Sequence, residues 1–127
     1  MKRTIWITLL ALAFALGICA FSKLGVDHTV LRARHLRTEA MLAMDAGDVQ
    51  RAEVILVELA SFMKEKQPVL EIICEHEDLH EMKGNIIDAQ ASIEFGIEDD
   101  FYQAIYRFGE GLDHISQTQK LSWENML

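Results

Sequence analysis

Apolar residues recur at helical spacing in four stretches of the chain. The clearest stretch runs from Val49 to about Lys66, where they follow the i, i+3, i+4, i+7 rule: Ala52, Ile55, Leu56, Leu59, Phe62 and Met63. Similar stripes predict helices from about Val26 to Asp45, from Pro68 to Phe95 and from about Asp100 to Gln119. The pattern therefore predicts an all-α domain of four helices.

The residues between the first three stripes predict how these helices are joined. Gly47 suits the left-handed conformation that often ends a helix, and Asp48 is a good N-cap for the next one. A turn this short requires the first two helices to lie antiparallel. Pro68, the only proline, is expected to end the second helix and to occupy the first turn of the third.

Two segments of the chain resemble each other. In both, a glycine break precedes an alanine by a few residues: Gly47 lies before Ala52, and Gly96 lies before Ala104. Asp48 is the N-cap of the first segment, and the N-cap of the second is expected at position 99 or 100. An alanine at this place allows two helices to cross closely, as in a tetratricopeptide hairpin, but the separation exceeds that repeat's unit of about 34 residues. We therefore expect two antiparallel helical hairpins, distantly tetratricopeptide-like.

The amino terminus has a different composition. Residues 4–22 carry no charge and follow the basic residues Lys2 and Arg3. Such a run is close to the roughly 20 residues that span a bilayer and longer than the core of about 7–15 residues in a signal peptide. The sequence thus predicts an N-terminal transmembrane helix. Residues 1–25 would form a membrane anchor that contacts lipid through residues 4–22, and residues 26–127 would form the helical domain.

Two features of this segment leave alternatives. Ala20 and Ser22 make a small-x-small site before Lys23, so a cleaved signal peptide stays possible. Basic residues lie on both sides of the apolar run, and the positive-inside rule therefore does not set the orientation. Because a short basic head before an apolar run is the form of an export signal, we expect a single-pass protein of the cell membrane with an extracytoplasmic C-terminal domain.

The charge of the chain bears on its partners. The formal net charge is −8, and every Asp and Glu residue lies at or after Asp27. An acidic domain repels nucleic acid, whose binding depends on neutralising phosphates. The exception is the cluster Arg32, Arg34 and Arg37, which could contact anionic head groups of lipids. The alternative is a solvated helix face on which these arginines pair with nearby glutamates.

The carboxyl terminus is unusually apolar. Trp123, Met126 and Leu127 lie at the very end of the chain, where exposed apolar side chains are costly. They are expected either to dock on the core of the protein or to bind a partner protein. Cys74 is the only cysteine outside the apolar run, so no disulfide can form within the domain.

One string resembles a catalytic motif. His76-Glu77-Asp78-Leu79-His80 matches HExxH, in which two histidines bind zinc and the glutamate activates water. Zinc catalysis also needs a third protein ligand. Glu94 would lie about 20 Å from His80 on one unbroken helix. Only a chain reversal at Gly84-Asn85 would bring it close, and the apolar spacing favours a continuous helix there.

We therefore predict that the string is coincidental. His76 lies between Ile72 and Leu79 on the apolar side of the stripe, which is typical of a hydrogen-bonded core histidine. No catalytic residue, metal or cofactor is predicted, and a metal site at His76 and His80 remains the weaker alternative.

The chain resembles a bacterial membrane-anchored family known as domain of unknown function number 4363. The similarity is carried by the Met-Lys-Arg-Thr-Ile-Trp-Ile start, by Ala46-Gly47-Asp48, by His76-x-Asp78-Leu79-x-Glu81, by Leu112-x-His114-Ile115 and by the closing Leu121-Ser122-x-Glu124-Asn125. The resemblance implies an anchor and a small helical domain, and it transfers no activity. It also suggests that His76 and His114 meet in the core between the third and fourth helices.

The expected function is non-enzymatic. The leading hypothesis is a scaffold or interaction module at the cell envelope, which presents a helical surface or its apolar tail to another envelope or membrane protein. The alternatives are a small zinc-dependent hydrolase that uses His76, Glu77 and His80, and a secreted binder of a ligand or metal. The sequence does not determine the oligomeric state.

Overall fold

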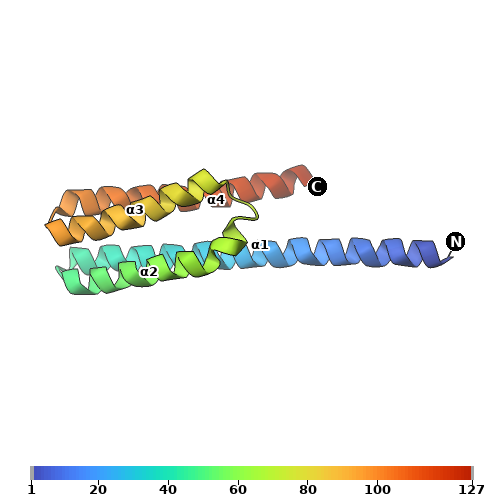
Figure 1. The fold of residues 1–127 in the computed structure, drawn as a ribbon, viewed down its shortest axis with the longest axis horizontal. Coiled ribbons are helices and arrows are strands. Elements are labelled where there is room, and N and C mark those ends of the chain that lie inside the picture. Colours follow the sequence, from blue (N-terminus) through green and yellow to red (C-terminus); the bar gives the residue numbers. More distant parts are fainter. Residues whose placement is uncertain (1, 127) are drawn as a thin grey trace.

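The computed structural model describes residues 2–126, and it describes their side chains except at residues 19, 22–24 and 122–126. This part of the chain is all-α (Figure 1). Its helices are α1 (Lys2–Asp45), α2 (Val49–Leu70), α3 (His76–Phe95) and α4 (Glu98–Met126). The all-helical prediction is confirmed.

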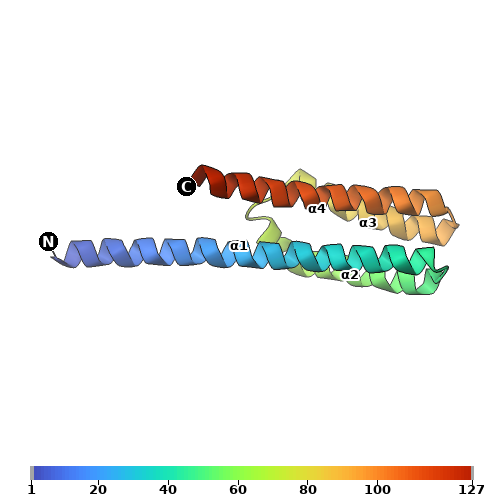
Figure 2. The ribbon, with the colours of Figure 1, turned by 180° about the vertical axis from the view of Figure 1, so that it is seen from behind.

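The helices form two antiparallel hairpins that lie side by side. In both views α1 pairs with α2, α3 pairs with α4, and the hairpins meet along α1 with α4 and α2 with α3 (Figures 1 and 2). Both hairpin turns lie at one end of the bundle. At the other end lies the α2–α3 connection, and α1 and α4 extend past it toward the two termini.

The two hairpin turns use the same backbone geometry. Gly47 and Gly96 have φ angles of +78° and +71°, in the left-handed region that favours glycine. In each turn the next residue donates its N–H back into the helix, Asp48 to the Ala43 carbonyl at 2.9 Å and Ile97 to the Ser92 carbonyl at 2.9 Å. The Asp48 side chain also accepts the N–H of Arg51 at 3.2 Å, which confirms the predicted cap.

The core combines alanines with large side chains. Buried alanines allow the helix axes to approach, and Phe101 and Phe108 of α4 are fully enclosed. The alanines with no exposed surface are Ala33, Ala40, Ala52 and Ala89. Ala52 and Ala104 are both buried where their hairpins cross, as the resemblance of the two segments predicts.

The predicted third helix is wrong at its start. Pro68 lies inside the last turn of α2, and residues 71–75 form a turn before α3 begins at His76. The Leu70 carbonyl accepts the N–H of Cys74 at 2.8 Å, which satisfies an acceptor that the helix end leaves free. Pro68 has no backbone N–H, so α2 loses one hydrogen bond there. Because the loss falls in the last turn, the helix tolerates it. Gly84 and Asn85 lie inside an unbroken α3, as predicted.

The fourth helix is longer than predicted at both ends. It begins at Glu98, so the predicted N-caps Asp99 and Asp100 lie within its first turn, where carboxylates favour the positive end of the helix dipole. It continues to Met126 instead of ending near Gln119. The side chains of Trp123 and Met126, and all of Leu127, lie outside the described residues, so the prediction for the apolar tail is not tested.

The amino terminus requires a correction. The first helix does not begin near Val26, because α1 is continuous from Lys2. Within residues 2–126, no helix is both long enough and apolar enough to cross a membrane, which contradicts the predicted transmembrane helix and single-pass location. Large apolar side chains of the amino-terminal segment, such as Phe14, are exposed.

Candidate binding groove between α2 and α3

A cavity lies between α2 and α3. We call it the α2–α3 groove, and its volume is about 390 Å³. One set of its lining residues is apolar and the other is polar or basic. The apolar set is Ala60, Met63, Leu70, Leu79, Ile86 and Ile87, and the polar set is Ser61, Lys64, Gln67, His76, His80 and Lys83. The volume falls in the range of about 300–1,000 Å³ that is typical of small-molecule sites.

Helical periodicity explains why these residues share one groove. On α2 the lining residues follow steps of three or four from Ala60 through Lys64 and Gln67, and on α3 they do so from His76 through Lys83. Residues three and four apart lie on one face of a helix. Leu70 and Ile86 are buried at the floor, whereas Lys64, His76, His80 and Lys83 are exposed at the rim.

The charge of the groove is opposite to that of the chain. Among the described residues, no carboxylate lines it, although the chain has a formal net charge of −8. The acidic residues of the first turns of α3, such as Glu77 and Glu81, face elsewhere. The rim therefore offers two ammonium groups and two imidazoles above an apolar floor.

Polar contacts distinguish the two seams between the hairpins. The α1–α4 seam holds an Arg34–Asp113 ion pair at 2.7 Å and a hydrogen bond from Arg37 Nε to the Ile105 carbonyl at 3.0 Å. A Cβ at Gly109 would lie 2.6 Å from the Arg37 guanidinium carbon, so glycine makes room for that contact. Among the described residues, no hydrogen bond or ion pair joins α2 to α3. The groove thus follows the seam that has only apolar contacts.

Tyr102 adds another link across the α1–α4 seam. Its hydroxyl donates a hydrogen bond to the Asp45 carboxylate, and this bond is the main reason that the pKa of Tyr102 is raised to about 12. Asp45 is the last residue of α1, and Tyr102 lies in the second turn of α4. The link therefore secures the end of the bundle that holds both hairpin turns.

The HExxH residues do not form a zinc site of the expected kind. His76 and His80 both line the groove, but Glu77 does not. Glu94 lies farther along the unbroken α3, about 20 Å from His80. Within the described part of the chain, no three His, Cys, Asp or Glu side chains are placed to hold a metal. His76 is exposed, so its predicted place in the core is wrong.

His114 also lies outside the core. Its side chain is 63% exposed, and its Nε2 atom lies 3.7 Å from Asp78 Oδ2. The predicted contact between His76 and His114 in the core is therefore wrong. Together with Cys74, Asp78 and His114 line a second cavity of about 280 Å³ at the α2–α3 connection. Sequence reasoning missed this cluster, because its members come from a turn and two helices.

The Cys74 thiol in this cluster is not activated. Burial, and to a smaller extent the charge of Asp78, raise its pKa to about 11. The thiolate is the nucleophile, so a raised pKa leaves little of it at neutral pH. Cys74, His114 and Asp78 have the residue types of a catalytic triad. The thiol, however, lacks the lowered pKa of a reactive cysteine.

We expect Cys74 to react slowly with a disulfide reagent such as dithiobis-nitrobenzoate at pH 8. A pKa of about 11 lowers the thiolate fraction on the order of 100-fold relative to an ordinary cysteine. The more basic thiolate is intrinsically about tenfold more nucleophilic, so the net rate should be about tenfold lower. Stopped-flow measurement in a Cys19→Ser background isolates Cys74, and the urea-unfolded chain is the control. Asp78→Asn should raise the rate, and equal rates in folded and unfolded chains would contradict the assignment.

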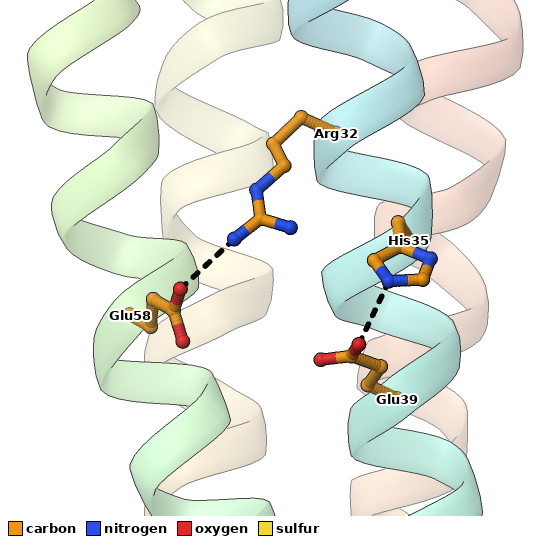
Figure 3. Close-up of polar contacts among 4 residues, drawn as sticks. All are labelled: Arg32, His35, Glu39 and Glu58. Atoms are coloured by element: carbon orange, nitrogen blue, oxygen red, sulfur yellow. Dashed lines mark hydrogen bonds and ion pairs between the residues drawn. The ribbon is translucent and has the colours of Figure 1, made fainter.

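The arginines of the cluster Arg32, Arg34 and Arg37 form ion pairs or hydrogen bonds within the bundle. Arg32 pairs with Glu58 of α2 at 3.1 Å, which agrees with the predicted pairing to a nearby glutamate (Figure 3). On the same face of α1, His35 Nε2 lies 2.7 Å from Glu39 Oε1. Arg34 and Arg37 contact α4 as described above. All three guanidinium groups therefore have partners inside the protein.

Comparison of the chain with protein-family models, with curated proteins and with solved structures finds no match in any of the three. The resemblance to domain of unknown function number 4363 and the tetratricopeptide-like description thus stay predictions.

Proposed function

We propose that this chain is a non-enzymatic helical binding module whose binding site is the α2–α3 groove. The observation that carries the proposal is the lining of the groove, with an apolar floor, a basic rim and no carboxylate in an acidic chain. Ligand sites are concave and mostly apolar, and a few polar groups orient the ligand. This is the ligand-binding alternative that the sequence left open.

The scaffold hypothesis has less support from the described residues. Its candidates Arg32, Arg34 and Arg37 form contacts within the bundle. Its other candidates, Trp123, Met126 and Leu127, have no described side chains. The hydrolase alternative depends on a third metal ligand and on Glu77 facing the metal, and Glu77 does not line the groove.

Nile red, a neutral dye that fluoresces in apolar surroundings, tests whether the groove binds a ligand. Ala60→Phe places a phenyl ring in the groove, and we expect it to remove most of the dye fluorescence that the groove contributes. Thr38→Phe adds the same ring at an exposed position of α1 and should leave the fluorescence unchanged. The exposed apolar residues near the amino terminus are identical in all three proteins and cancel in the comparison.

Equal fluorescence of the wild-type chain and Ala60→Phe would contradict the proposed site. A different measurement addresses the non-enzymatic part. Stoichiometric zinc in the purified protein, together with a hydrolase activity, would overturn it if both were lost in His80→Asp.

A further inference from the structure

We infer that the α2–α3 groove binds a single-chain anionic amphiphile, an alkyl chain that ends in a carboxylate. The inference rests on the proposed function and specifies the ligand of the same site. It follows from the length of the groove, from the position of its cations and from the apolar seam along which it lies.

The length of the groove matches an alkyl chain. Its α2 wall extends from Ala60 to Leu70, which is about 15 Å at about 1.5 Å per residue. An extended alkyl chain advances about 1.25 Å per carbon, given C–C bonds of about 1.5 Å, so about twelve carbons match this length.

The cations mark where an anionic head would lie. Because α2 and α3 run antiparallel on either side of residues 71–75, residues equally distant from this connection lie at the same level. Lys64 is thus within about one residue of the level of Lys83, and Gln67 is within about one residue of the level of His80. The two lysines are exposed on opposite walls, and among the described residues neither forms an ion pair. A carboxylate between them would neutralise two like charges and accept their N–H groups.

The apolar seam provides a way for the chain to enter. The hairpins are linked along α1 and α4 by the Arg34–Asp113 pair and by the Arg37 hydrogen bond. No such link among the described residues crosses from α2 to α3. Widening the groove therefore breaks apolar contacts only, and an alkyl chain replaces these contacts with its own methylenes.

The test is displacement of Nile red from the full-length chain below the critical micelle concentration. The groove signal is the difference in fluorescence between the wild-type chain and Ala60→Phe. We expect dodecanoate to displace the dye at a concentration about tenfold lower than uncharged dodecanol. Octanoate should need at least a tenfold higher concentration than dodecanoate, because each half-buried methylene is worth about twofold in affinity, and full burial is worth about fourfold.

The charge of the lining is tested by a matched pair of double variants. Lys64→Gln with Lys83→Gln should remove the preference for dodecanoate over dodecanol. Lys66→Gln with Lys120→Gln changes the net charge equally at positions that do not line the groove, and it should preserve the preference.

Several results would overturn the inference. Equal displacement by dodecanoate and dodecanol, or an unchanged preference in Lys64→Gln with Lys83→Gln, would exclude the anionic head while the groove stands as a binding site. Displacement by an acidic amphipathic peptide but not by dodecanoate would assign the groove to a protein partner. Absence of any groove signal from Nile red would overturn both this inference and the proposed function.

Discussion

Replacing Phe108 with alanine is expected to lower the free energy of unfolding by about 3–5 kcal/mol, which is the usual cost of removing a buried aromatic ring. Phe108 has no exposed surface and lies in the middle of α4, within the cluster that all four helices share. The deletion would leave a cavity, and long helices with few connections can close around it only in part. A small domain has a total stability of about 5–15 kcal/mol, so the loss is a large fraction.

Phe95→Ala is the matched control for this prediction. The same atoms are removed from the last residue of α3, but the Phe95 side chain is 74% exposed. We expect a change within about 0.5 kcal/mol, as for most surface substitutions. Urea denaturation followed by far-UV circular dichroism measures both variants. Similar midpoints for Phe108→Ala and Phe95→Ala would show that the four helices do not pack as described.

The contrast between these phenylalanines shows what a periodic pattern predicts and what it does not. Phe108 lies on the predicted stripe of the fourth helix and is buried, as that stripe requires. Phe95 is the last residue of α3 and is exposed. The i, i+3, i+4 rule assigns a residue to a face, but burial also requires another helix opposite that face.

The hairpin turns are the part of the fold that the sequence predicts best. Gly47, Asp48 and Gly96 act through local geometry, because a left-handed residue or a cap needs only its own neighbours. The paired alanines Ala52 and Ala104 add a short-range packing signal that was also correct. From these residues the antiparallel hairpins follow without knowledge of the rest of the chain.

The α2–α3 connection could not be predicted in the same way. Leu70, Ile72 and Ile73 continue the apolar spacing into α3, so periodicity alone favours one helix through the whole segment. In the structure, Leu70 closes α2 and is buried, whereas Ile72 lies in the turn and is 70% exposed. This shift of the helix start changes the face assigned to His76, and the predicted core histidine becomes a residue of the groove rim.

The groove itself is a property of two helices and of the space between them. In the sequence, the α2 residues of the groove lie at the border between the apolar and polar faces of an ordinary amphipathic helix. The same is true of its α3 residues. Only the antiparallel register of the two helices brings Lys64 near the level of Lys83 and His80 near the level of Gln67. The sequence carries no local signal for the groove, because Glu65 interrupts the lining positions on α2 and Glu77 and Glu81 interrupt those on α3.

The same substitution at two alanines of α2 should change the free energy of unfolding by very different amounts. Ala52→Phe is expected to lower the free energy of unfolding by about 3 kcal/mol, at the upper end of the usual cost of overpacking. Ala52 has no exposed surface and lies where α2 crosses its neighbours close to the Gly47 turn. A phenyl ring there must push two helices apart or adopt a strained rotamer, and the polar links of the α1–α4 seam resist that movement.

Ala60→Phe, two turns further along α2, should change the free energy of unfolding by less than about 1 kcal/mol, because the groove of about 390 Å³ receives the new ring without moving a helix. Loss of apolar exposure at Leu79 and Met63 would offset the small cost in side-chain entropy. Thermal and urea denaturation of the two variants side by side measure the difference. If Ala60→Phe were as destabilised as Ala52→Phe, the space between α2 and α3 would be filled in solution, and the groove would not be a binding site.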